Sequence, residues 1–100
     1  MTTRLMVFAT PHDGMDDEYN RWYTEVHIPD MLAIPGVVSA ERHQLVRGAP
    51  DEMRYLSVFV LDAEPSAVLA EIGARAKDGR MTMSASADPA RTRITVWDSL

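Results

Sequence analysis

The sequence has no cysteine among its 100 residues. Disulfide bonds, thiolate metal sites and a cysteine nucleophile are therefore excluded. A chain without cysteine is compatible with a reducing compartment, and we expect a cytoplasmic location. The three histidines, His12, His27 and His43, do not have the close spacing of a zinc site, so no metal is implied.

Basic residues are in deficit, with 10 Lys and Arg against 15 Asp and Glu and a net charge of −5. This balance disfavours binding to nucleic acid or to anionic lipid, because both need a basic surface. Long apolar runs are missing too. The first one, residues 5–9, is shorter than the core of a signal peptide, and nothing approaches the roughly 20 apolar residues that span a bilayer. We expect neither nucleic acid nor a membrane as partner.

The sequence also lacks a glycine-rich phosphate loop, a G-x-S-x-G motif and an H-E-x-x-H motif, and no cofactor is expected. Its apolar fraction of 46% and charged fraction of 25% are ordinary for a globular protein. A chain of this length predicts one domain over residues 1–100. A core this small often gains further burial by oligomerisation.

Hydrophobic periodicity and turn residues predict four strands, at residues 3–10, 37–46, 54–61 and 91–97. Two amphipathic helices are predicted between them, the first beginning near residue 16 and the second at residues 66–77. Pro29 should break the first helix, because its ring clashes with the carbonyl of Glu25 and it lacks a backbone N–H. A short turn should restart at Pro29.

The resulting β-α-β-β-α-β order is the ferredoxin-like pattern, an α+β fold with one four-stranded antiparallel sheet and both helices on one face. We expect the helical crossovers to be right-handed and to join parallel neighbouring strands. The strand at residues 54–61 is apolar on both faces, which suits a central position. The other sheet face would be bare, and this predicts a homodimer that packs sheet against sheet.

His27 is the first candidate for chemistry. It lies at the edge of a helical arc formed by Tyr19, Trp22, Tyr23 and Val26. Histidine is the side chain whose unperturbed pKa permits proton transfer near neutral pH. Two interpretations remain open: an acid–base group in a pocket, or a cap on the broken helix through a backbone carbonyl.

Tyr23 precedes His27 by one helical turn and could donate a hydrogen bond to a substrate or orient the imidazole. Plain core packing is the alternative for Tyr23. Trp22 and Tyr19 are candidates for the wall of an aromatic pocket, and both also suit the core.

Two further binding candidates, His43 and Tyr55, lie on the strands of the predicted hairpin. Alternation places His43 on one face of its strand and Arg42 on the other. The sequence does not determine which of the two faces the helices. For His43 and Arg42 the sequence favours a half-exposed position at an edge or a dimer rim.

The segment from residue 19 to 37 resembles the EthD-like family of the dimeric α+β barrel superfamily. The family core is W-Y-x-x-x-H-x-P followed by P-G, and the matching residues are Trp22, Tyr23, His27, Pro29, Pro35 and Gly36. The motif covers about 20 residues, while the layout of strands and helices agrees over most of the chain.

The resemblance implies a dimer whose two sheets form a closed barrel, with a pocket between helices and sheet in each subunit. Relatives in the superfamily include polyketide cyclases, muconolactone-type isomerases, cofactor-free quinol monooxygenases and haem-degrading enzymes. EthD itself is associated with breakdown of a fuel ether. Carried onto this chain, the family pattern implies a catalytic His27 with Trp22 and Tyr23 as pocket neighbours. The haem-degrading residue set has no counterpart here, so haem is not expected.

Two functions follow from these observations. The first is a cofactor-independent lyase or isomerase acting on a small apolar, aromatic or polyketide-like molecule, with His27 moving a proton and Tyr23 stabilising an enolate oxygen. The second is a non-catalytic binder or accessory protein for a small hydrophobic metabolite. A third, a cofactor-free oxygenase, would need an electron-rich substrate and a polar pocket.

Overall fold

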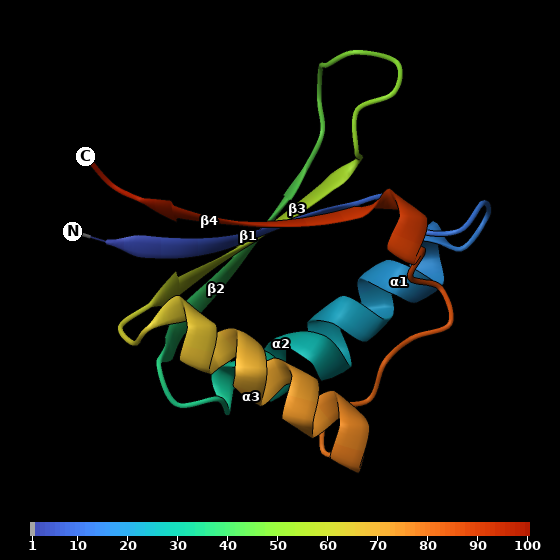
Figure 1. Ribbon diagram of the computed structural model, residues 1–100. Helices are drawn as coiled ribbons and strands as arrows, with labels where there is room; N and C mark the ends of the chain where they lie inside the picture. The colour runs from blue at the N-terminus through green and yellow to red at the C-terminus, as the bar shows by residue number, and fades with distance from the viewer. Residues whose placement is uncertain (1) are drawn as a thin grey trace.

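The computed structural model describes residues 2–100 as a four-stranded antiparallel sheet with its helices on one face (Figure 1). In this part of the chain, no helix has the length and apolar character needed to cross a membrane. The β-α-β-β-α-β order is confirmed, and the sheet order is β2-β3-β1-β4. The strands are β1 (Thr3–Ala9), β2 (Val37–Gln44), β3 (Tyr55–Leu61) and β4 (Thr92–Asp98). The helical elements are α1 (Asp16–Trp22), a π-helix (Tyr23–His27), α2 (Ile28–Leu32), α3 (Pro65–Asp78) and a 3-10 turn (Pro89–Arg91).

The prediction that each crossover joins parallel neighbours is wrong. β3 lies between β1 and β2, β1 lies between β3 and β4, and all three neighbouring pairs are antiparallel. A helix is about 10 Å wide, roughly twice the spacing of adjacent strands. Each crossover therefore joins two strands that are separated by the width of one more strand. β3 occupies this place between β1 and β2, and β1 occupies it between β3 and β4.

The predicted break at Pro29 is also wrong, because the chain stays helical through the proline. Ile28, the residue before it, has helical angles of φ −60° and ψ −48°. Its N–H donates to the carbonyl of Tyr23, five residues back. This π-helical register gives the physical reason: it widens the helix just before Pro29 and displaces the carbonyls that its ring would meet in an α-helix.

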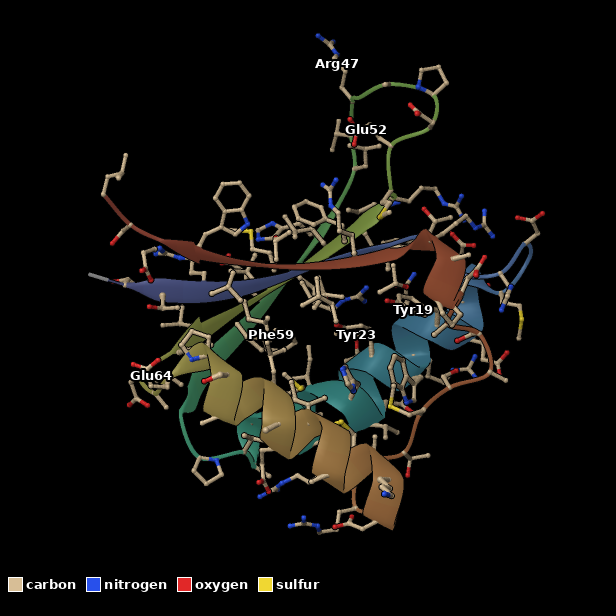
Figure 2. All side chains as sticks on the ribbon, in the orientation of Figure 1. Tyr19, Tyr23, Arg47, Glu52, Phe59 and Glu64 are labelled. Atoms are coloured by element: carbon tan, nitrogen blue, oxygen red, sulfur yellow. The ribbon has the colours of Figure 1, made fainter. Side chains whose placement is uncertain are left out.

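The core lies between the sheet and the helices, where Figure 2 shows Tyr23 and Phe59. Odd-numbered residues of β1 and β3 point toward the helices, so both strands contribute large apolar side chains to this layer. The sheet side of the core consists of Leu5, Ala9, Val37, Phe59 and Leu61. The helices and loops add Tyr19, Tyr23, Met31, Ile34, Val68 and Met81.

A β-bulge near the start of β2 determines which of its residues face the helices. Val37 pairs with Leu61 and is buried, but the next pair is Ser39 with Val60, so β2 has one extra residue there. An extra residue reverses the alternation of side chains beyond it. Arg42 consequently points toward the helices and His43 points away from them.

The opposite surface of the sheet, here called the open face, carries no helix (Figure 1). The pairing register places Met6 beside Val58 and Phe8 beside Leu56 on this face. Trp97 of β4 is on the same face and is exposed. The loop between β2 and β3 also rises on this side of the sheet (Figure 1). The centre of the open face is thus apolar, and no helix covers it.

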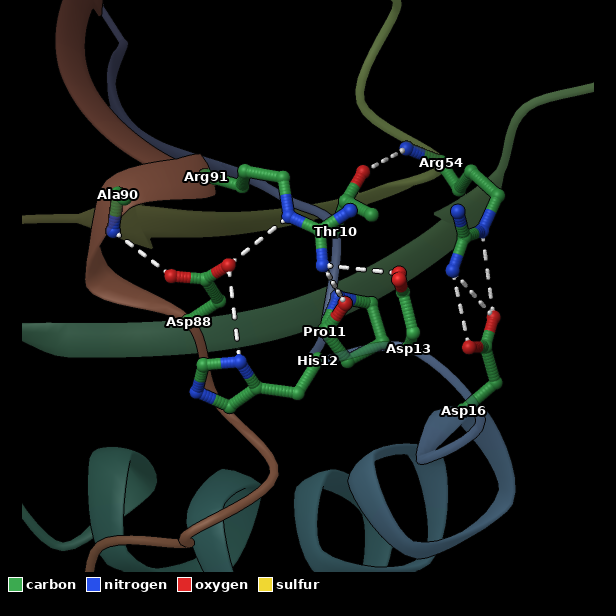
Figure 3. A network of polar contacts seen from close by, with 9 residues as sticks. All are labelled: Thr10, Pro11, His12, Asp13, Asp16, Arg54, Asp88, Ala90 and Arg91. Carbon is green, nitrogen blue, oxygen red and sulfur yellow. Dashed lines mark hydrogen bonds and ion pairs between the residues drawn. The ribbon is translucent and has the colours of Figure 1, made fainter.

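Polar contacts tie the start of α1 to the end of the sheet (Figure 3). Arg54 forms a two-pronged ion pair with Asp16, and the Tyr55 hydroxyl donates to the same carboxylate at 2.8 Å. The Tyr55 hydroxyl and Arg54 hold the pKa of Asp16 below its ordinary value. A second group joins Arg91 to Asp88 and to the carbonyl of Pro11. These contacts fix the start of α1, the helix that carries Tyr19 and Trp22, against the sheet.

Candidate functional site

A cavity of about 150 Å³ lies between the sheet and the helices. Leu69, Met83 and Ile94 at its wall are exposed to solvent, so the cavity is open there. Its volume is below the roughly 300 Å³ usual for ligand pockets, but an apolar cavity of about 150 Å³ holds benzene. Deeper in, the wall consists of Leu5, Val7, Met31, Phe59 and Ile72, together with Trp22, Tyr23 and His27.

The π-helix brings three aromatic residues of the predicted site together. The imidazole of His27 stacks on Trp22 with ring centres 4.5 Å apart, and it meets Tyr23 edge-on at 4.8 Å. Residues five apart, such as Trp22 and His27, point about 140° away from each other in an α-helix. The i to i+5 register of the π-helix reduces this difference. Trp22 is fixed in turn, because its indole N–H donates to the carbonyl of Thr82 at 2.9 Å.

The His27 imidazole is buried, and its Nδ1 atom has no hydrogen-bond partner. It therefore does not cap the helix through that nitrogen. Burial lowers the pKa of His27 to about 4, with Asp30 opposing this shift and Arg42 adding to it. The ring is neutral at neutral pH, so it is available to accept a proton or a hydrogen bond.

The Tyr23 hydroxyl is a second buried polar group without a partner. Burial raises the pKa of Tyr23, while the Ser57 hydroxyl and Arg42 lower it by smaller amounts. Ser57 is close enough for this influence, but no hydrogen bond of normal geometry joins the two hydroxyls. Tyr23 therefore keeps its proton, and its hydroxyl is a free donor on a residue that lines the cavity.

Arg42 is half-buried on β2, an edge strand, which agrees with the position that the sequence favours for it, and it adds a cationic side chain next to Tyr23. Its guanidinium lies over the Tyr23 ring, 4.2 Å from the centre. Nη1 donates to Oδ1 of Asn20 at 3.0 Å, Nε donates to the Ser57 hydroxyl at 3.4 Å, and Nη2 is buried without a partner. The bulge in β2 places Arg42 here, and alternation in the sequence carries no signal for it.

The other predicted binding residues lie away from the cavity. Tyr19 is buried beside Tyr23 at 5.4 Å between ring centres, in the core rather than at the cavity wall. Tyr55 points its hydroxyl at Asp16. His43 is on the open face, where its Nε2 atom is 2.8 Å from a carboxylate oxygen of Glu41. Within residues 2–100 no cluster of three potential metal ligands forms.

Comparison with known proteins gives matches in structure but not in sequence. No protein-family model matches the chain, and no curated protein matches it either. An ethyl tert-butyl ether d (EthD) family protein from Bacillus halodurans superposes with a TM-score of 0.61 at 16% identity, and the match covers 100% of both chains. A DABB family protein with a ferredoxin-like fold from Mesorhizobium loti gives 0.67 at 16% identity, covering 99% of this chain and 97% of the other. The chain has a ferredoxin-like fold.

A third similar structure is that of a protein described as a dimer. It is described as a dimeric ferredoxin-like protein of unknown function from a Jannaschia species. Its TM-score is 0.64 at 15% identity, and the match covers 99% of this chain and 100% of that one. The predicted fold class is therefore confirmed by the architecture and by these neighbours.

Because the Tyr23 hydroxyl has no hydrogen-bond partner, we expect Tyr23→Phe to stabilise the ferredoxin-like domain. The change removes a buried polar group that makes no hydrogen bond and should raise the free energy of unfolding by about 1 kcal/mol. The matched control is Tyr55→Phe, which removes a hydroxyl bonded to Asp16 and should lower that free energy by about 1 kcal/mol. Urea denaturation of both variants measures the two signs. Equal destabilisation by both would contradict the prediction.

Burial of His27 also predicts a pH dependence of stability. Its folded pKa of about 4 lies below the ordinary histidine value of 6.5, so the unfolded chain takes up the proton first as pH falls. His27 should therefore lower the free energy of unfolding progressively from about pH 6.5 to pH 4, by a total of about 3 kcal/mol. Above this range the ring is neutral in both states and has no such effect.

The change is measured as the difference between wild type and His27→Gln in urea denaturation across that range. His43→Gln is the control, since that side chain is half exposed on the open face. A wild-type curve parallel to that of His27→Gln would show that His27 is not buried as a neutral ring.

Proposed function

We propose that the chain is an EthD-like, cofactor-independent lyase or isomerase acting on a small apolar, aromatic or polyketide-like substrate. The observation that supports this most is that two residues lining the apolar cavity each have a buried polar atom without a hydrogen-bond partner. These atoms are the Tyr23 hydroxyl and Nδ1 of His27. A buried polar group without a partner costs about 1–3 kcal/mol, and a substrate oxygen would supply the missing partner.

In the proposed reaction His27 moves a proton and Tyr23 holds the oxygen on which negative charge develops. The neutral imidazole removes a proton from carbon or oxygen of the substrate. The Tyr23 hydroxyl donates to the adjacent carbonyl oxygen as it becomes an enolate. A base with a pKa of about 4 is weak in the empty cavity. Negative charge forming on the substrate beside the ring raises that pKa as the proton is transferred.

Membership of the EthD-like family is part of the same proposal. Its support is the W-Y-x-x-x-H-x-P pattern, whose Trp, Tyr and His meet at the cavity wall. The structural match to an EthD family protein over the whole chain adds to this. The absence of cysteine is consistent with a cytoplasmic location for the enzyme.

We further propose that two copies of the chain pack through their open faces into an α+β barrel. The centre of this face consists of the apolar residues Met6, Phe8, Leu56 and Val58, and no helix of the chain covers it. The loop at residues 45–54 projects on the same side and would contact the second copy (Figure 1). One structural neighbour is described as dimeric.

A non-catalytic binder is the second candidate, and one observation favours it specifically. The cavity of about 150 Å³ is small for a substrate and the groups that act on it. In this case His27 and Tyr23 would anchor a ligand by hydrogen bonds without moving a proton.

Acetophenone in D₂O separates the two candidates. It is a small aryl ketone, uncharged, whose methyl protons exchange with solvent only through an enol or enolate. Loss of the methyl proton signal, faster with wild type than with His27→Gln, is the result expected of the enzyme. Binding seen as shifts of the Trp22 and Tyr23 signals, with no exchange after long incubation, would favour the binder. Absence of both binding and exchange would overturn the proposal.

A further inference from the structure

We propose that Arg42 binds an anionic oxygen of the ligand, so that the molecules recognised at this site are small aromatic acids. The proposal rests on the proposed function in one respect: the apolar part of the ligand occupies the cavity between the sheet and the helices. Arg42 does not line that cavity itself, but its guanidinium lies over the ring of Tyr23, which does, and it would hold the carboxylate beside Tyr23.

The charge of Arg42 has no counter-ion within residues 2–100. Its hydrogen-bond partners, Asn20 and Ser57, are both neutral. Every ion pair within residues 2–100 involves a different cation. Nη2 of Arg42 is buried and has no partner of any kind. Arg42 as a whole is half-buried, and a cationic donor that is withdrawn from water is normally paired, because desolvating an unpaired charge is costly. The chain has a net charge of −5 and therefore an excess of carboxylates, yet none of those that the structure describes pairs with Arg42.

Aromatic rings hold the guanidinium in place. It lies 4.2 Å from the centre of the Tyr23 ring, with Tyr19 at 5.7 Å and Tyr55 at 5.6 Å. Attraction to the ring faces offsets part of the desolvation cost but provides no acceptor for the N–H groups. The rings and the bond to Asn20 also keep the side chain from turning outward. The donor on Nη2 is thus fixed before any ligand binds.

Ser57 brings Arg42 and the Tyr23 hydroxyl to one place. It pairs directly with Arg42 across β2 and β3, and its buried hydroxyl accepts from Nε of Arg42. The same Ser57 hydroxyl lowers the pKa of Tyr23. Two unpartnered donors, one of them cationic, therefore lie around a single serine, and Tyr23 forms part of the cavity wall. A carboxylate oxygen carries negative charge and only accepts hydrogen bonds, so it satisfies the free donor and the charge of Arg42 and leaves the Tyr23 hydroxyl for the carbonyl oxygen.

Benzoate and benzyl alcohol test the proposal by isothermal titration calorimetry. They share a ring of the size that an apolar cavity of about 150 Å³ accommodates and differ in the charge of the attached group. Wild type should bind benzoate about 10- to 100-fold more tightly than benzyl alcohol. Arg42→Met should remove this preference and leave the affinity for benzyl alcohol within about twofold of wild type.

The matched control is Arg93→Met, because Arg93 also lies over an aromatic ring, 4.9 Å from the centre of Phe8, on the open face. It should leave both affinities unchanged. If Arg42→Met does not fold, NMR of the wild-type arginine side chains replaces it: benzoate, and not benzyl alcohol, should shift the Nε–H signal of Arg42.

Equal affinity of wild type for the two compounds would overturn the assignment of Arg42 while leaving the ligand cavity intact. If Arg42→Met lowers the affinity for both compounds equally, Arg42 has a packing role, and its assignment as the anion-binding residue is overturned. If neither compound binds wild type, the cavity itself is not a ligand site, and the proposed function fails together with this inference.

Discussion

Replacing His27 with glutamine should lower the rate of proton transfer in the pocket by about 10²- to 10⁴-fold. Glutamine retains hydrogen-bonding groups at this position but cannot take up a proton near neutral pH. The stacking of the imidazole on Trp22 and its contact with the Tyr23 edge fix the ring that does so. The rate of methyl proton exchange in acetophenone, followed by NMR in D₂O, measures the change.

His43→Gln is the control for this experiment, because His43 lies on the open face beside Glu41 and away from the cavity. Its rate should equal that of wild type. The two variants have the same chemical change, so a loss confined to His27→Gln locates the proton transfer. Full exchange activity in His27→Gln would reject His27 as the acid–base group.

Met6→Glu should convert the proposed dimer into a monomer. Met6 lies near the centre of the open face, between Val58 of β3 and Thr95 of β4. In the dimer the substitution would bury one unpaired carboxylate from each copy, at a cost of several kcal/mol. The dissociation constant should rise by at least about 10³-fold.

Light scattering at micromolar concentration gives the mass directly. Wild type should have twice the chain mass of 11.2 kDa, and Met6→Glu should have the single mass. Leu32→Glu is the control, since it places the same charge at an exposed apolar residue on the helical side. A wild-type mass of one chain would reject the dimer. A dimer unaffected by Met6→Glu would move the interface away from this face.

The arrangement of strands and helices could be predicted from the sequence because it depends on patterns that extend over many residues. The apolar stretch Tyr55–Leu61 indicated a central strand, and it is β3, with a neighbour on each side. The behaviour of Pro29 could not be predicted in this way. Whether a proline breaks a helix or is accommodated by a π-turn depends on packing around it, here of Tyr23, His27 and Met31.

The site could be predicted in part for the same reason. The helical period places Trp22 and Tyr23 in one arc with His27 at its edge. The stacking of His27 on Trp22 depends on the π-helix, which that period does not predict. Arg42 lies on a strand whose orientation depends on one extra residue near its start, so alternation gave two equivalent interpretations. The position of Tyr55 depends on its partner Asp16, which is 39 residues away in the chain. Such a long-range pairing has no local signal.

The bulge at the start of β2 bears on how a pocket of this kind could change its ligand over evolutionary time. Deleting Val38, the unpaired bulge residue, would leave Arg42 opposite Ser57. Deleting Glu41, beyond the bulge, would instead move every later residue of the strand by one position. His43 would then occupy the position toward the helices that Arg42 occupies now. Loss of a single codon would thereby exchange a permanent cation for an ionisable imidazole without substituting either side chain. In a lineage of such proteins, short insertions and deletions in this strand would separate acid-binding members from the rest more sharply than point substitutions.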